Sequence, residues 1–155
     1  MNAEELWNAF CEESGTEHST PHEAWAFGGN PDHLADLVLR GIKTATASGY
    51  DLYFLEGETE PLPKPGDYSV ILNSREEAVC VIRTVKTSVV PFLEVTEEHA
   101  YKEGEGDRSL AYWRAVHEDF FLKDFAESGA VFTDQSRILC EEFEVCFKAD
   151  PNGNS

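Results

Sequence analysis

Apolar residues recur at helical spacing in three stretches of the chain, and each stretch carries a signal for the start of a helix. Asn2 and Glu5 have the spacing of a capping box, so we expect a helix that runs to about residue 13. Asn30 can cap a second helix, which is expected over residues 31–40. Ser109 precedes a bulky apolar stripe, which predicts a third helix that ends near residue 125.

Runs rich in Val and Ile predict β-strands over residues 68–72, 78–85 and 88–93, with a hairpin connection at residues 73–76. Apolar and polar residues alternate over residues 143–147, which is typical of a strand with one buried face. This order of elements predicts an α+β fold. We expect a small β-barrel or a strongly curved, mainly antiparallel sheet with flanking helices.

The connecting segments complete this picture. Residues 42–46 follow the second helix directly and are rich in β-branched side chains, so they are expected to be extended. Residues 56–67 contain three prolines and several acids, which indicates a long surface connection. The chain has the length of one domain. We expect residues 1–24 to pack as a helix and loop on a domain of residues 25–149, and residues 150–155 to be a frayed tail.

The net charge limits the partners of such a domain. Thirty Asp and Glu residues against twelve Lys and Arg give a formal charge of -18. Nonspecific binding to nucleic acids depends on Lys and Arg that release counterions from phosphates, so an acidic surface disfavours it. Any contact with RNA or a nucleoside should therefore be local and should take place in a pocket.

The four cysteines form no CxxC pair and have no histidine at zinc-site spacing, so no structural metal or other cofactor is expected. We interpret them as small buried apolar side chains. The first residues lack a basic run followed by a long apolar stretch, which argues against a signal peptide or a membrane span. A cytoplasmic location is the expectation.

The segment Gly41-x-Lys43-x-x-Thr46 is the first candidate site, because it lies where a helix gives way to an extended segment. A solvated lysine and an ordinary strand threonine are the simpler interpretation. Residues three apart point to opposite sides of a regular strand. Lys43 and Thr46 can therefore act together only if the segment contains a tight turn or a bulge.

The acidic run at residues 96–107 is the second candidate. Its acids lack the order of an EF-hand, and solvation is the usual fate of such a run, so no metal site is predicted. Glu103 differs from its neighbours because Gly104 and Gly106 allow the backbone to bend close to a ligand. We expect its carboxylate to point inward while the neighbouring acids stay in water.

Other side chains could support a pocket, although each also has a structural interpretation. His99 and His117 could transfer protons, but a histidine at a helical position is more often a structural partner. Trp113 and Arg114 could stack on a base, although Trp113 also belongs to the apolar stripe of its helix. Arg83 could contact a phosphate or a carbonyl group, or could simply lie on the surface.

The chain resembles the ASCH family, a branch of the PUA-like superfamily, from about residue 25 to residue 147. The segments that carry the resemblance are residues 25–28, 37–46, 65–67, 91–92, 103–107, 113–114, 117 and 120–121. The resemblance implies a small PUA-like β-barrel with helices around it. It also implies a cleft lined by the GxKxxT segment, in a family associated with RNA or modified nucleosides.

Some members of this family are amidohydrolases that remove the acetyl group of N4-acetylcytidine, and another member has been described as a ribonuclease. The lysine, threonine and glutamate that act together in the amidohydrolases fall on Lys43, Thr46 and Glu103 here. Gly41, Arg83, Trp113 and Arg114 are the expected substrate-binding residues. The chain is longer than those amidohydrolases, with an N-terminal helix and an EGEGD loop at residues 103–107, so their substrate does not transfer automatically.

The leading hypothesis is hydrolysis of an amide on a nucleoside base, with the Thr46 hydroxyl as nucleophile. Glu103 would accept the proton while the charged Lys43 stabilises the oxyanion, or a neutral Lys43 would be the base. One alternative is a noncatalytic RNA- or nucleotide-binding module in which Lys43 and Arg83 hold phosphate. A ribonuclease is the other, and next to the acidic loop it would need a divalent ion.

Overall fold

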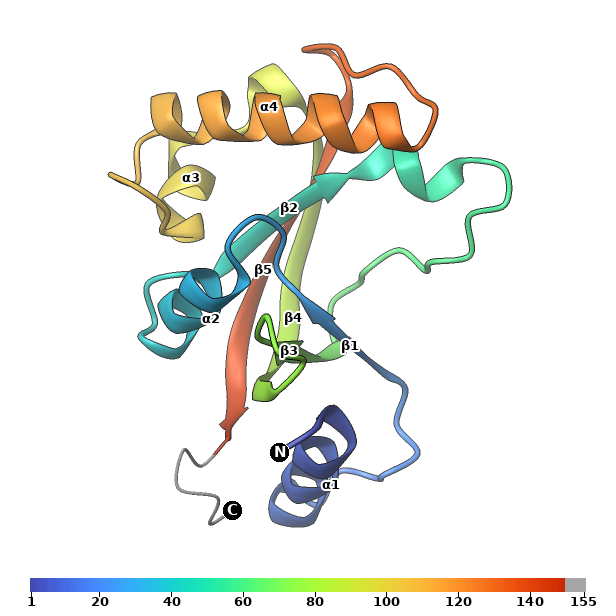
Figure 1. Ribbon diagram of the computed structural model, residues 1–155, viewed down its shortest axis with the longest axis vertical. Helices are drawn as coiled ribbons and strands as arrows, with labels where there is room; N and C mark the ends of the chain where they lie inside the picture. Colours follow the sequence, from blue (N-terminus) through green and yellow to red (C-terminus); the bar gives the residue numbers. More distant parts are fainter. Residues whose placement is uncertain (150–155) are drawn as a thin grey trace. The chain divides into compact units, whose positions relative to one another are not determined.

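The computed structural model describes residues 1–149, and the expected frayed tail of residues 150–155 lies outside this range. The described α-helices are α1 (Ala3–Ser14), α2 (Pro31–Leu39), α3 (Glu97–Glu103) and α4 (Leu110–Glu127), with 3-10 turns η1 (Tyr50–Phe54) and η2 (Phe92–Glu94) (Figure 1). The strands are β1 (His22–Ala26), β2 (Ala45–Gly49), β3 (Tyr68–Leu72), β4 (Ala78–Pro91) and β5 (Arg137–Lys148). They form one sheet with the strand order β1-β3-β4-β5-β2.

Pairing in this sheet is mainly antiparallel. β3 pairs with β4 and β2 pairs with β5 in antiparallel register, whereas β1 pairs with β3 in parallel. The chain forms two compact units, and β4 and β5 contribute residues to both. Unit 1 comprises Met1–Ile42, Pro65–Val85 and Phe143–Ser155, and unit 2 comprises Lys43–Lys64 and Lys86–Glu142.

Unit 1 contains the helices that the sequence predicts most clearly. The Asn2 side chain accepts a hydrogen bond from the Glu5 backbone, and the Glu5 side chain accepts one from Asn2, so the predicted capping box is confirmed. Leu6 and Trp7 of α1 pack with Val70 of β3 in an apolar cluster. Burial of side chains of this size contributes about 1.5–3 kcal/mol each. α2 is confirmed as well, and its apolar face packs in a second cluster.

Two features of the sheet differ from the prediction. No strand was predicted at β1, and the expected loop before residue 25 covers its first residues, because the side chains of β1 are mostly exposed and do not alternate clearly. β4 is one continuous strand, although a break was expected between residues 85 and 88. Lys86 lies in this exposed part of the strand, where a polar side chain carries no burial cost. The predicted hairpin is confirmed, with Asn73 Oδ1 accepting hydrogen bonds from the backbone of Arg75 and Glu77.

Unit 2 supplies the residues of the candidate site. Figure 1 shows α3 (yellow) next to α4 (orange). The core of this unit is an apolar cluster to which α4, η2 and β5 contribute, formed by Phe92, Val95, Ala100, Trp113, Phe121, Phe125, Phe132, Ile138 and Cys140. A side chain at Gly49 would place its Cβ 2.7 Å from the Phe125 ring, so β2 approaches α4 closely here. The predicted third helix is confirmed as α4.

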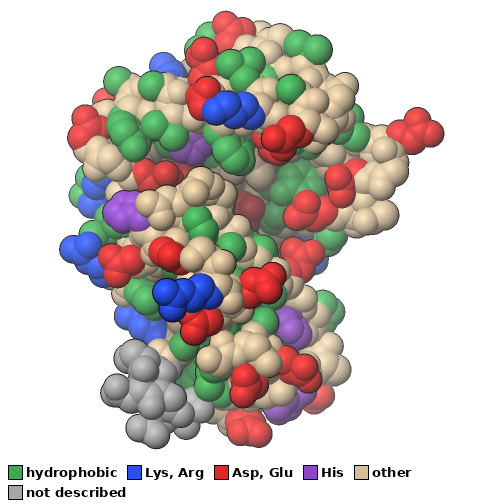
Figure 2. All heavy atoms as spheres, viewed as in Figure 1, with side chains coloured by type: hydrophobic (Ala, Val, Ile, Leu, Met, Phe, Trp, Pro, Cys, Tyr) green, Lys and Arg blue, Asp and Glu red, His purple; other side chains and the backbone are tan. Residues whose placement is uncertain are grey.

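The surface and the cysteines agree with the sequence. Figure 2 shows Asp and Glu side chains spread over the visible face, with Lys and Arg scattered among them. Cys11, Cys80 and Cys140 are buried, Cys146 is half-buried, and all four are free. Burial raises the pKa of both Cys80 and Cys140 to about 12. Within residues 1–149, no helix is long and apolar enough to cross a membrane.

Candidate functional site

A buried ion pair joins the start of β2 to the end of α3. Lys43 precedes β2, and Glu103 is the last residue of α3. Lys43 Nζ lies 3.1 Å from Glu103 Oε1, and each residue is only 1% exposed. The Thr44 N–H donates a 2.7 Å hydrogen bond to Lys102 O, which holds the segment before β2 against α3. The sequence separation is 60 residues, so tertiary structure alone creates this pair.

Both oxygens of the Glu103 carboxyl group are held by side chains. Trp113 Nε1 of α4 donates to Oε2 at 2.6 Å, and His99 Nε2 lies 2.7 Å from the same oxygen. Lys43 and His117 face Oε1, with His117 Nε2 at 3.6 Å. His99 precedes Glu103 by one helical turn, and Trp113 and His117 are likewise one turn apart, so two helices present these groups together.

This environment determines the charge of Glu103. Burial opposes its ionisation, but the positive charge of Lys43 and the contacts with His117 and His99 outweigh this effect. The pKa of Glu103 therefore lies well below its usual range. The carboxylate is anionic and fully engaged, which makes it a strong anchor and a weak proton acceptor.

Glu105 supplies a second carboxylate to Lys43. Its Oε2 lies 3.0 Å from Lys43 Nζ, and its side chain is 18% exposed. Gly104 and Gly106 adopt positive φ angles of 74° and 60°, which turn the chain so that Glu105 faces the same ammonium as Glu103. The expectation that only Glu103 points inward is therefore wrong.

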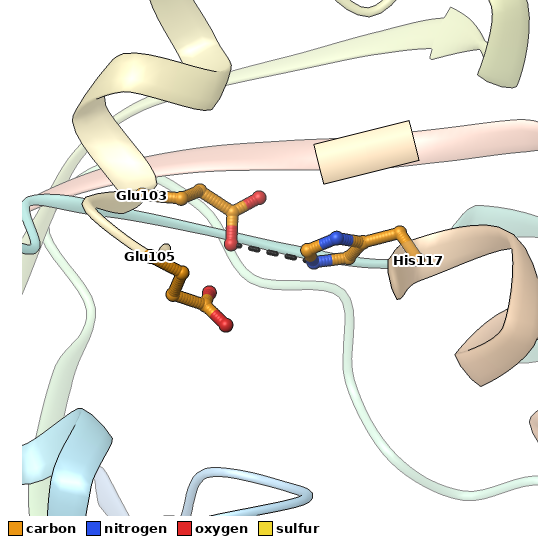
Figure 3. Close-up of side chains that lie close together, drawn as sticks. All are labelled: Glu103, Glu105 and His117. Carbon is orange, nitrogen blue, oxygen red and sulfur yellow. Dashed lines mark ion pairs between the residues drawn. The ribbon is translucent and has the colours of Figure 1, made fainter. Parts of the chain in front are cut away.

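Figure 3 shows the carboxyl group of Glu103 turned toward His117, with Glu105 beside them. One ligand atom from each of these three residues lies within 4.8 Å of the others, a spacing that could hold a metal ion. The His117 Nδ1 lies 2.9 Å from the Trp113 carbonyl oxygen. A carbonyl only accepts, so Nδ1 carries a hydrogen and Nε2 faces Glu103. However, the Lys43 ammonium already contacts both carboxylates, so a divalent ion would have to compete with it.

Thr46 is placed differently from Lys43 and Glu103. β2 pairs regularly with β5, so its side chains alternate between the two faces. Ala47 packs against the cluster that contains Trp113, and Thr46 points to the opposite face. Among residues 1–149, no hydrogen bond joins Thr46 to Lys43 or Glu103. The nucleophile role of Thr46 stays a prediction.

The remaining predicted residues have structural contacts of their own. Arg83, in unit 1, forms an ion pair with Glu144 at 2.8 Å. Gly41 follows α2 with a positive φ of 75°, the left-handed conformation that commonly ends a helix. Arg114 donates to the Leu93 carbonyl oxygen at 2.6 Å and so braces η2. Their roles in substrate binding stay predictions.

Trp113 is a core residue, as the apolar stripe of its helix predicts, and its stacking on a base stays a prediction. It is 2% exposed and packs in the core, while its N–H reaches Glu103. The sequence indicated His99 and His117 as proton-transfer groups or structural partners but did not connect them to Glu103, and it missed Glu105 as a member of the centre. The signal that could have found the histidines is their spacing of one helical turn from Glu103 and Trp113.

A groove of about 200 Å³ in unit 2 has His99 in its wall. Lys102 in this groove lies 2.8 Å from Glu142 and 3.0 Å from Glu98. The hydrogen bonds that the Lys102 ammonium donates to Glu142 and Glu98 raise the pKa of Lys102. These charges compensate one another within the groove.

The buried charge centre on an α+β scaffold can be compared with known proteins. The ASCH domain family model matches residues 23–146. The chain is similar to the ASCH domain from Lactobacillus crispatus JV V101, with 31% identity over 92% of this chain and 95% of that chain and a TM-score of 0.82. It is also similar to a protein from Enterococcus faecalis V583, with 33% identity, 95% and 89% coverage and a TM-score of 0.84. No curated protein matches.

The chain belongs to the ASCH domain family. The predicted family and the predicted fold class, a PUA-like α+β fold with a curved and mainly antiparallel sheet, are therefore confirmed. A hypothetical protein titled PH0355 shares the fold alone, with 16% identity, coverage of 81% and 99%, and a TM-score of 0.54.

Proposed function

We propose that this protein hydrolyses an amide on a modified nucleoside, such as the acetyl group of N4-acetylcytidine, at the Lys43 centre. The observation that carries the proposal is the burial of Lys43 and Glu103, each 1% exposed. A buried ion pair has a desolvation cost that its attraction often fails to offset, so stability alone is a weak reason to keep one. Buried charges with perturbed ionisation concentrate at functional sites.

In this proposal Lys43 stabilises the negative charge that develops on the acyl oxygen during attack. Glu103 positions the ammonium and does not itself accept the proton. Its oxygens already face Lys43, His99, Trp113 and His117, and its pKa is well below the usual range despite burial. The contacts therefore favour an anchoring role for Glu103 over the role of proton acceptor that the sequence suggests.

The attacking group in this proposal is water. A threonine nucleophile needs its hydroxyl next to a proton acceptor. Thr46 lies on the β2 face opposite Ala47 and has no hydrogen bond to Glu103 among residues 1–149. A water molecule is not fixed to β2 as the Thr46 hydroxyl is. It can approach the Lys43 centre from the side of Glu105, whose side chain is partly exposed.

A panel of acylated nucleosides tests the proposal. N4-acetylcytidine, N4-benzoylcytidine and N6-acetyladenosine would each be incubated with the purified chain, and the free nucleoside would be quantified by chromatography. We expect release from at least one acylated cytidine, with acetate or benzoate formed in equal amount. If no member of the panel is cleaved at millimolar concentration, the chain is not an amidohydrolase of this class.

A noncatalytic module that binds a nucleotide or RNA is the second candidate. It is favoured by one observation: three oxygens lie 3.0, 3.1 and 3.4 Å from Lys43 Nζ and fix the position of the ammonium. Affinity that depends on phosphate contacts falls steeply as salt rises. Binding of cytidine monophosphate that weakens strongly between 50 and 500 mM NaCl, without turnover of any acylated nucleoside, would favour this candidate.

A further inference from the structure

The Lys43 ammonium faces two carboxylates that differ in how firmly they are held. The Glu103 side chain is 2% exposed and also contacts His99, Trp113 and His117. The Glu105 side chain is 18% exposed. Among residues 1–149, its carboxyl group forms a hydrogen bond with Lys43 and with no other side chain. Of the two carboxylates, Glu105 is thus the one that can leave Lys43 without breaking other hydrogen bonds.

The backbone around Glu105 is fixed independently of this contact. The Arg108 N–H donates to the Glu105 carbonyl oxygen at 3.0 Å, and the Arg108 guanidinium lies 3.6 Å over the Tyr101 ring. A Cβ at Gly106 would lie 2.5 Å from the Tyr112 ring, so this ring covers the loop closely. Release of Lys43 by Glu105 therefore requires rotation of one side chain and no opening of the loop.

We propose that the position of Glu105 Oε2, 3.0 Å from Lys43 Nζ, is the subsite for the acyl oxygen of the substrate and for the carboxylate product. Glu105 fills this subsite with an oxygen of its own. The substrate carbonyl takes its place on Lys43, and the displaced Glu105 carboxylate then lies beside the acyl carbon. The choice of an acyl ligand rests on the proposed function.

The displaced carboxylate completes the chemistry. The oxygen of water bonds to the acyl carbon while one proton of that water passes to Glu105. The resulting oxyanion faces Lys43. The C–N bond then breaks as the proton on Glu105 passes to the amine nitrogen, which gives the free nucleoside and the carboxylic acid. Glu105 is thus the catalytic carboxylate, and Glu103 is a positioning residue.

Acetate is the probe for the subsite, because it can bind Lys43 whether or not the chain is an amidohydrolase. Acetate labelled with ¹³C would be titrated into wild type, Glu105→Ala and Glu118→Ala, and followed by NMR. Glu118 is an exposed residue of α4, so its removal changes the net charge by the same amount. We expect Glu105→Ala to bind acetate at least about tenfold more tightly than wild type, because a competing and repelling carboxylate is gone.

Adding Lys43→Met to Glu105→Ala should remove this gain, whereas Glu118→Ala should resemble wild type. Equal acetate affinity in Glu105→Ala and wild type, or a gain that persists without Lys43, would overturn the subsite.

The catalytic step is tested by turnover, where Glu105→Gln should lower kcat at least about a hundredfold with little change in KM. If wild type cleaves acylcytidine and Glu105→Gln cleaves it equally well, the step is wrong while the proposed function stands. Tighter acetate binding without any wild-type turnover would leave the subsite standing and reject the proposed function.

Discussion

The indole N–H of Trp113 donates a 2.6 Å hydrogen bond to Glu103 Oε2, so a residue of the apolar core also holds the buried carboxylate. The same indole stacks on His117, with ring centroids 4.2 Å apart. The core of unit 2 and the charge centre therefore share a side chain. A change in the ionisation of Glu103 should consequently change the free energy of unfolding.

Acid should remove a stabilising contribution that depends on Glu103. The folded pKa of Glu103 lies below its unfolded value, so its carboxylate stabilises the fold above the ordinary glutamate pKa of about 4.3. This contribution is lost as the pH falls through the folded value. Urea unfolding at intervals between pH 6 and pH 3 should show wild type losing stability more steeply below about pH 4.5 than Glu103→Gln. A parallel pH dependence in the two proteins would mean that Glu103 has an ordinary pKa.

The Lys43 and Glu103 side chains should be energetically coupled. Lys43→Met leaves a buried carboxylate without its main countercharge, and we expect a loss of about 3–5 kcal/mol in the free energy of unfolding. The double variant Lys43→Met/Glu103→Gln should lose less than the sum of the two single changes. Chemical denaturation of all four proteins measures the coupling. Strict additivity would show that the 3.1 Å pair contributes no interaction energy.

Removal of the Thr46 hydroxyl should leave turnover largely intact. Thr46→Val keeps the β-branched shape that suits β2, so it tests the hydroxyl without disturbing the strand. We expect kcat within about tenfold of wild type, whereas loss of a true nucleophile costs on the order of 10³-fold or more. An inactive Thr46→Val beside an active Thr46→Ser would restore Thr46 as the nucleophile and reject attack by water.

Chelation of divalent ions should have no effect on amide hydrolysis. Lys43 already provides a positive charge next to Glu103 and Glu105, at 3.1 and 3.0 Å, so the proposed hydrolysis requires no metal. Rates measured in excess EDTA and in added Mg²⁺ or Mn²⁺ should agree within error. A rate that vanishes with EDTA and returns with one metal would instead assign a metal-binding role to Glu103, Glu105 and His117.

The sequence predicts the elements whose signals are local. The capping box at Asn2 and Glu5, the cap at Asn30 and the stripe after Ser109 each predict a helix that the structure contains. The sequence does not predict β1, because this strand forms by pairing with β3 in the tertiary structure and its exposed side chains leave no periodic pattern. The full length of β4 was not predicted for a similar reason, since the exposed half of this strand tolerates polar residues.

The candidate site was less accessible to sequence reasoning. The resemblance to the ASCH family directed attention to Lys43 and Glu103, and tertiary structure brings them together across 60 residues. The direction of the Glu105 side chain depends on positive φ angles at Gly104 and Gly106. Glycine permits such angles but does not require them, so the sequence does not predict the direction. Spacing alone indicated that Lys43 and Thr46 need a turn or bulge to cooperate, and β2 pairs regularly from Ala45 onward.

The most direct test is the rate of cytidine release from N4-acetylcytidine by wild type, Lys43→Met and Lys123→Met. Lys123 is a surface residue paired with Asp119, so its replacement matches the chemical change without touching the centre. Circular dichroism and thermal melting of each protein would show that it is folded at the assay temperature. We predict wild-type rates for Lys123→Met and a loss of about a hundredfold to a thousandfold for folded Lys43→Met, as expected when a main oxyanion-stabilising group is removed. Equal rates for the two variants would contradict the account.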